Sequence, residues 1–170
     1  MPEPVTLMFW TARAAAALYA AALALLLLGG GRSWRYPAAR AAYTAGCGLL
    51  WVHVGLAFHV AHGWSHADAV RVTAERTAEL TGVRSGFGVY LNYLFMAVWA
   101  ADAAYWWRAG HARYLGRPRG VTLVVHGFLL FIAFNAAVVF VAGTARHAGA
   151  AVVALLAVLA ILAMRRRHRR

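Results

Sequence analysis

Five long apolar stretches, separated by short segments rich in Arg, Gly or Pro, dominate this sequence of 170 residues. A helix rises about 1.5 Å per residue, so each stretch can cross a hydrocarbon core of about 30 Å, the last of them only just. The hydrophobic fraction of 63% would force a soluble domain to expose large apolar patches. We therefore expect an all-α, polytopic membrane helix bundle that forms one integral membrane domain over 1–170. The expected spans are about 6–29, 41–62, 86–107, 120–142 and 148–164.

Arginine predicts the orientation of these spans, because Arg-rich connections stay in the cytoplasm. The connections 30–40 and 108–119 and the tail from Arg165 onward are Arg-rich, whereas 63–85 mixes acidic and basic residues. We expect a multi-pass protein of the cell membrane with its N-terminus outside and its C-terminus cytoplasmic. The first stretch lacks a clearly basic leader and a small-x-small cleavage pattern, so we expect it to remain as a span.

The formal net charge is +12, and all seventeen cationic residues are Arg. They cluster between and after the apolar stretches and do not form one stripe with interleaved aromatic residues, which argues against a nucleic-acid partner. The lipid bilayer is the expected partner. Ala-rich and Gly-rich faces would also let a second membrane protein, or a second copy of the chain, pack closely.

The long outer connection is expected to contain a short amphipathic helix over about 66–81. Ser65 and Asp68 have the spacing of a helix-capping pair, and Gly82 follows as a stop signal. The least polar side of this helix consists of small residues, which suits packing on other helices better than insertion into lipid. We expect it to lie as a lid on the outer end of the bundle.

Histidines concentrate at the outer end of the second span. At about 100° per residue, His59, His62 and His66 share one helix face, and a break at Gly63 would turn His66 back toward the other two. Imidazole suits Zn, Cu or Fe, and a carboxylate of the outer helix, such as Asp68 or Glu75, could complete a coordination sphere. The alternative is that these histidines are polar residues at a wet interface or bond a neighbouring helix.

A haem b held by two histidines is a second cofactor hypothesis. His53 and His126 are the only deep pair, but their levels in the membrane should differ by roughly 9 Å, which is awkward for two ligands of one iron. Asp102 is the only acidic residue inside a span, and His126 or Arg108 is its expected partner. Asn92 and Asn135 are expected to bond each other or to support the histidines.

Nucleotide-binding, serine-nucleophile, CxxC and kinase patterns are all missing from the sequence, which argues against the common enzyme and carrier classes. The leading hypothesis is a small membrane protein that binds a transition metal or redox cofactor at its His-rich outer end, alone or as a subunit of a membrane complex. The competing hypothesis is a structural or assembly protein without a cofactor, whose polar residues serve helix packing.

Overall fold

The computed structural model describes residues 3–27 and 34–136 and a few isolated positions between 147 and 158. These residues form five α-helices and no strand, which confirms the all-α class for the described chain. The helices are α1 (Pro4–Leu27), α2 (Arg35–Ala61), α3 (His66–Thr81), α4 (Gly88–Gly116) and α5 (Arg119–Phe134).

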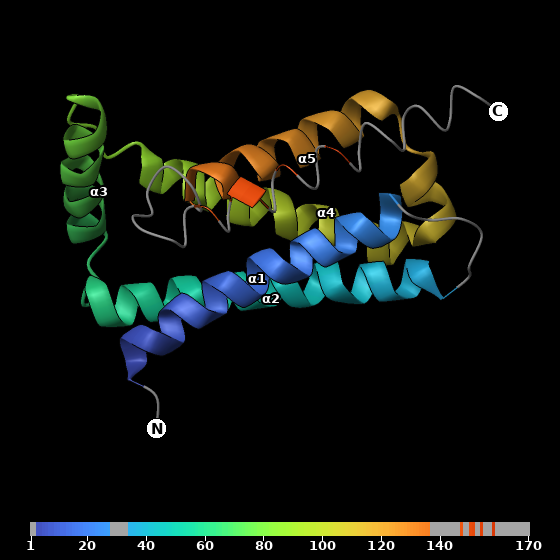
Figure 1. Ribbon diagram of the computed structural model, residues 1–170, viewed down its shortest axis with the longest axis horizontal. Helices are drawn as coiled ribbons and strands as arrows, with labels where there is room; N and C mark the ends of the chain where they lie inside the picture. The colour runs from blue at the N-terminus through green and yellow to red at the C-terminus, as the bar shows by residue number, and fades with distance from the viewer. Residues whose placement is uncertain are drawn as a thin grey trace.

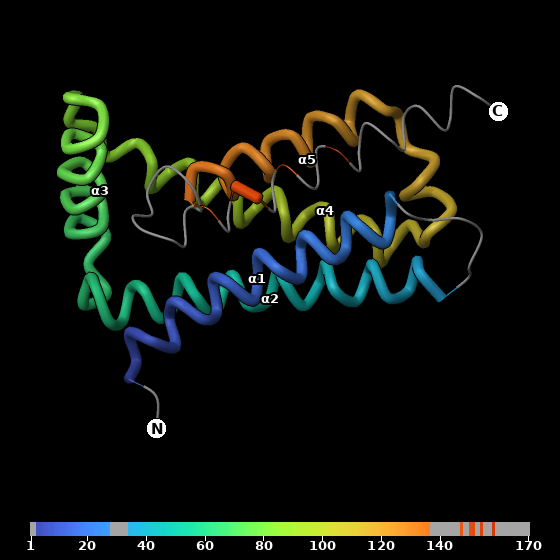
Figure 2. The backbone as a smooth tube through the Cα atoms, viewed as in Figure 1, coloured from blue at the N-terminus to red at the C-terminus, as the bar shows by residue number. Residues whose placement is uncertain are grey.

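Four of the helices run along the long axis of the molecule, and α3 stands across one end (Figure 1). α2 packs beside α1 and runs in the opposite direction. α3 crosses the end of the bundle, α4 leads away from α3, and α5 leads back toward it. Figure 2 shows that the reversal between α4 and α5 lies at the end far from α3. We call these two ends the α3 end and the reversal end.

Two helices, α1 and α2, are long and apolar enough to cross a membrane, which is consistent with a membrane location. α4 and α5 pass the same test only as a pair that is bent by 118° where the helices join. Large apolar side chains point outward, including Leu123 and Val124, which are 69% and 72% exposed. The predicted span 148–164 lies outside the described residues except for isolated positions, and so does most of 135–142.

Close helix packing in the centre depends on Gly46 of α2. A Cβ atom at this position would lie 3.1 Å from the backbone oxygen of Ala15 in α1 and 3.1 Å from the Trp99 ring in α4. A side chain here would require α1 or the Trp99 ring to shift by a few tenths of an ångström, so the glycine favours the close approach of these three helices. Around this point the core is aromatic, with Tyr43 and Trp106 fully buried.

The helix predicted over 66–81 is confirmed at both ends as α3. The Ser65 side chain accepts a hydrogen bond from the Asp68 backbone N–H at 3.1 Å, and Gly82 ends the helix in the left-handed region with φ of 76°. Because Ala69 is its one buried residue among those described, α3 covers the bundle end with a small contact area.

The connection expected over 108–119 is helical over most of its length. α4 continues to Gly116 across a break at Gly110, where φ is 75° and ψ is 171°. Such a φ is easily reached only by glycine, which explains why the helix turns here. The break and the following turn bring Arg117 back into the bundle, as described below.

Candidate functional site

A sharp turn after His62 sets the geometry of the α3 end. Gly63 and Trp64 have φ values of 52° and 62°, and the Trp64 N–H donates to the Phe58 oxygen at 2.8 Å. A left-handed φ is unfavourable for Trp, so the fold holds this residue in a strained conformation. α2 ends at this turn, and α3 begins after it in a direction steeply inclined to α2 (Figure 1).

His62 and Asp68 hydrogen-bond across this turn. The His62 Nδ1 lies 2.9 Å from an oxygen of the Asp68 carboxylate, which also accepts from Arg71 at 2.5 Å. Hydrogen bonds from His62 and Arg71 lower the pKa of the Asp68 carboxyl below its ordinary value. Since a carboxylate only accepts, the neutral imidazole of His62 carries its proton on Nδ1, which leaves Nε2 as an acceptor.

The other predicted metal ligands point to different partners. The helix break at Gly63 is present, but His66 turns to α4, where its ring nitrogens lie 2.9 Å from the Tyr93 hydroxyl and 3.4 Å from that of Tyr90. His59 is exposed, and its ring lies 6.2 Å from that of Trp64. Glu75 accepts from Arg71 at 3.0 Å, and the same guanidinium donates to Asp68.

The structure therefore brings together one predicted pair, His62 with Asp68, and not the whole set of His59, His62, His66, Asp68 and Glu75. Across the described residues, no three His, Cys, Asp or Glu side chains lie close enough to hold one metal ion. The helical spacing of about 100° per residue ends with α2 at Ala61, so it does not extend to His66.

His53, deeper in α2, is held in the same way as His62. Its Nδ1 lies 2.9 Å from the backbone oxygen of Met8 in α1. A carbonyl oxygen only accepts, so the proton again sits on Nδ1 and Nε2 is left as an acceptor. An oriented imidazole with an acceptor on its second nitrogen is the arrangement found where histidine binds a metal or a ligand.

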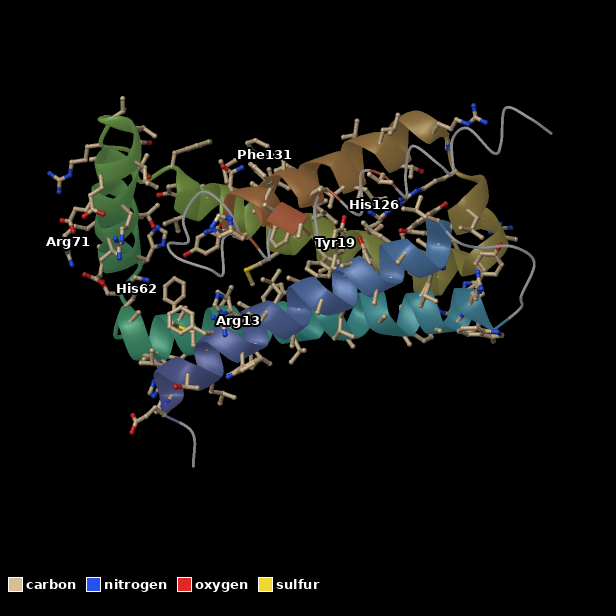
Figure 3. The ribbon with its side chains drawn as sticks, viewed as in Figure 1. Arg13, Tyr19, His62, Arg71, His126 and Phe131 are labelled. Carbon is tan, nitrogen blue, oxygen red and sulfur yellow. The ribbon has the colours of Figure 1, made fainter. Side chains whose placement is uncertain are left out.

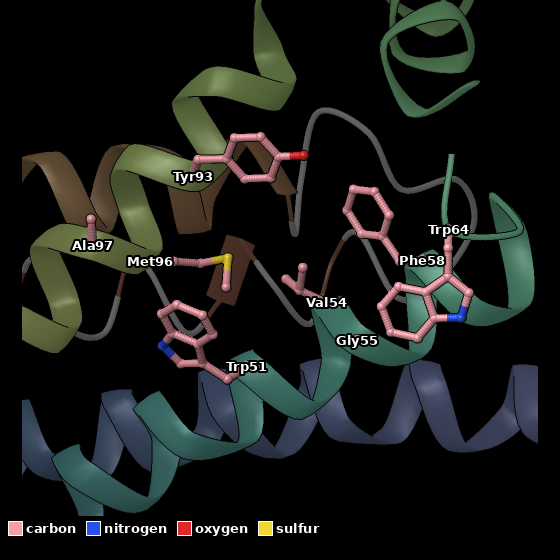
Figure 4. Close-up of a pocket in the computed structure, with 8 residues that line it drawn as sticks. All are labelled: Trp51, Val54, Gly55, Phe58, Trp64, Tyr93, Met96 and Ala97. Atoms are coloured by element: carbon pink, nitrogen blue, oxygen red, sulfur yellow. The ribbon is translucent and has the colours of Figure 1, made fainter. Parts of the chain in front are cut away.

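His53 and His62 line one small cavity of about 130 Å³ between α2, α3 and α4. Its other polar lining groups are Thr73, Asn92 and Tyr93. A larger open groove of about 410 Å³ adjoins it and is almost entirely apolar. Figure 4 shows the aromatic wall of the groove on α2 and the turn, facing Tyr93 and Met96 of α4. The two spaces share Val54, Phe58, Tyr93 and Met96.

A second polar cluster is buried toward the reversal end. Asp102 of α4 pairs with Arg117, and their side chains are 5% and 4% exposed. The hydroxyls of Tyr43 and Tyr114 donate to the same carboxylate at 2.9 and 2.7 Å. The Tyr114 ring stacks on Trp106 with centroids 4.1 Å apart. Three separate segments of the chain therefore meet at one carboxylate.

His126 of α5 completes this cluster. Its Nε2 lies 3.2 Å from a guanidinium nitrogen of Arg117, which only donates, so Nδ1 carries the proton and faces the Tyr19 hydroxyl at 3.2 Å. Figure 3 shows Tyr19 and His126 facing each other inside the bundle. Both ring nitrogens are engaged, and His126 could ligate a haem only by giving up one of these bonds. The residues present therefore fit the haem hypothesis, with His53 as the second ligand, poorly.

The partner of Asp102 was predicted in part. His126 lies in its cluster, but Arg108 is exposed and Arg117 forms the ion pair. Arg117 lies in a segment that reads as a hydrophilic connection, and the only sequence signals of its return into the bundle are Gly110 and Pro118. Asn135 bonds its own helix, donating to the Phe131 oxygen at 2.7 Å.

Comparison of the chain with protein-family models, with curated proteins and with solved structures finds no match.

Proposed function

We propose that this chain is a small multi-pass membrane protein that binds a redox cofactor at the α3 end of its bundle, alone or as a subunit of a membrane complex. The observation that carries the proposal is the pair His53 and His62. Each is oriented through Nδ1 by an acceptor that fixes its tautomer, and both line the same cavity. Two independent hydrogen bonds that both leave Nε2 as an acceptor favour a ligand-binding role over simple helix packing.

The position of the cavity supports the proposal. Ala69 and Thr73 of α3 line the cavity, and α3 stands across the end of the bundle (Figure 1). A groove with an apolar wall adjoins the cavity. A cofactor there would sit near the membrane surface yet remain covered by α3. Such a site restricts access of water to the bound group while keeping it close to a partner at the surface.

The orientation proposed with this function has five spans, the N-terminus outside and the C-terminus in the cytoplasm. It is supported by the Arg-rich reversal end, which carries Arg108, Arg113 and Arg119, and by the mixed charges of α3. In a Cys47→Ala background, Glu79→Cys in α3 should react with a membrane-impermeant maleimide added to intact cells, and Arg113→Cys should react only after lysis. The reverse pattern contradicts the orientation.

The cofactor is tested on protein purified in mild detergent without chelators. Elemental analysis, an absorption spectrum and mass spectrometry of an organic extract together detect a metal, a haem or an organic cofactor. We expect one of them in stoichiometric amount. His53→Ala and His62→Ala should reduce the amount, whereas His59→Ala should not, because His59 does not line the cavity. A wild-type protein that carries none of the three refutes the proposal.

A structural or assembly role without cofactor is the second candidate, and the buried cluster around Asp102 favours it. Its carboxylate, guanidinium, hydroxyl and imidazole groups all bond one another, so the cluster can be explained by helix packing alone. This role predicts that His53→Ala and His62→Ala lower stability in detergent without removing any bound group, and that a membrane protein partner co-purifies.

A further inference from the structure

We propose that the cofactor is a lipid-soluble quinone, bound preferentially as the quinol, with its ring in the small cavity and its apolar tail in the adjoining groove. This inference rests on the proposed function, because it names the class of molecule that the same site takes. It draws on the size of the cavity, the hydrogen-bonding character of its walls and its continuity with the groove.

The size of the cavity selects a single small ring. Its volume is about 130 Å³, and an engineered cavity of about 150 Å³ in another protein binds benzene. A six-membered ring therefore fits with little adjustment. A porphyrin is several times larger and would require α2 and α4 to separate.

The polar walls select a ring that carries hydrogen-bond donors. In the neutral imidazoles of His53 and His62 the proton on Nδ1 faces Met8 or Asp68, which leaves Nε2 of each ring as an acceptor. Two acceptors on residues that line one partly polar cavity are complementary to a ligand that carries donors. The hydroxyls of a quinol supply such donors, while the Asn92 amide and the Thr73 hydroxyl can serve either oxidation state.

The groove provides the place for an apolar tail. Its wall is formed by Trp51, Phe58 and Trp64 on one side and by Met96 on the other (Figure 4). Gly55 lies in its floor, and a Cβ atom there would meet nothing within 4 Å. Since the groove is open and no residue of α3 lines it, a lipid-soluble molecule could enter it without crossing α3.

The other occupant to consider is the chain's own apolar segment 148–164. It contains only Ala, Gly, Val, Leu, Ile and Met, so it has no side chain that could donate to His53 or His62. A quinol satisfies both the polar cavity and the apolar groove, whereas this segment would satisfy only the groove.

The experiment measures binding of a decyl-tailed benzoquinol to the purified full-length protein under anaerobic conditions, by calorimetry in detergent. The matched ligand is the oxidised quinone with the same tail, which has the same heavy atoms and lacks both donors. We expect the quinone to bind about tenfold more weakly or worse, as the loss of one or two hydrogen bonds implies. Equal affinity for the two ligands overturns the proposal without any mutation.

Two pairs of variants test the site itself. Gly55→Leu should block the groove and weaken quinol binding about tenfold or more, whereas Gly48→Leu, two turns earlier on the same face of α2 and outside the groove, should not. His62→Phe should weaken binding of the quinol more than binding of the quinone, and His59→Phe should change neither. Equal effects of Gly55→Leu and Gly48→Leu, or cross-linking of 148–164 into the groove of the wild type, overturn the proposal.

The outcome also separates this inference from the proposed function. A purified protein that carries a metal or a haem but binds no quinol keeps the proposed function and refutes the quinone. A protein that carries no cofactor and binds no quinol refutes both.

Discussion

Arg117 and Asp102 form a buried ion pair that joins the turn before α5 to the middle of α4, with side chains 4% and 5% exposed. Because both charges are away from bulk water, each depends on the other and on the surrounding hydroxyls for compensation. The turn between α4 and α5 is therefore fixed by a charge inside the bundle and not only by the length of the connection.

Removing one partner of this ion pair should destabilise the protein more than removing both partners. Arg117→Met leaves the Asp102 carboxylate unpaired and should lower the free energy of unfolding in detergent by about 3–5 kcal/mol. The double variant Asp102→Leu with Arg117→Met should be less destabilised than Arg117→Met alone. Arg76→Met, which removes the exposed pair with Glu79, is the control and should change stability little. Additive losses in the double variant would show that the two charges are not coupled.

Gly86 should be essential for the docking of α3. A Cβ atom at Gly86 would lie 2.8 Å from the Val70 backbone oxygen, so Gly86→Ala forces α3 away from the start of α4. We expect a loss of about 1–3 kcal/mol, with faster hydrogen exchange confined to α3. Gly127→Ala, in open space on α5, is the matched control and should stabilise its helix by up to about 1 kcal/mol. Unchanged exchange in α3 after Gly86→Ala would contradict the close contact.

Acid should loosen the contact between α3 and the end of α2. The folded-state pKa of Asp68 is lowered by His62 and Arg71, so its contribution is fully present above the ordinary carboxyl pKa of 3.8. It is lost as the pH falls through the lowered value. Hydrogen exchange of α3, corrected for its intrinsic pH dependence, should rise over this range in the wild type and rise less in Asp68→Asn. Glu79→Gln should behave as the wild type, and a wild-type response from Asp68→Asn would exclude this origin.

The N-terminal cap of α3 should contribute measurably because few other contacts hold this helix. Ser65→Ala removes the acceptor for the Asp68 backbone N–H and should destabilise α3 by about 1 kcal/mol. Thr77→Ala, whose hydroxyl bonds only the Thr73 oxygen one turn earlier, should have no such effect. Exchange of the first amides of α3 reports both, and identical behaviour of the two variants would show that the cap is dispensable.

The sequence predicts α3 well because its start and stop signals are local. Ser65, Asp68 and Gly82 act on the backbone within one turn of their own positions, so their roles can be inferred without tertiary contacts. The all-α class follows in the same way from the length and composition of the apolar stretches. The five-span arrangement and its orientation stay predictions.

The candidate site is less predictable because its residues meet through a turn and across helices. The break expected at Gly63 is present, and Gly63 and Trp64 both take a left-handed φ. The sequence does not predict where the chain turns after the break, and His66 meets Tyr93 of α4. The sequence does not predict the ion pair of Arg117 with Asp102. Within its own segment, an Arg that pairs with a buried carboxylate looks the same as an Arg that faces solvent. Long-range pairing of this kind is decided by the whole bundle.

The close packing of α1 on α2 at Gly46 has a consequence for biosynthesis. These helices leave the ribosome first and can associate in the bilayer early, but the Tyr43 hydroxyl of α2 then lacks its acceptor until Asp102, 59 residues later, arrives. Asp102 in turn needs Arg117, which emerges 15 residues afterward. We therefore expect α4 and α5 to insert together as one hairpin, with the turn between them, after α1 and α2 have associated. If α4 inserted alone, the Asp102 carboxylate would enter the lipid without a neutralising partner.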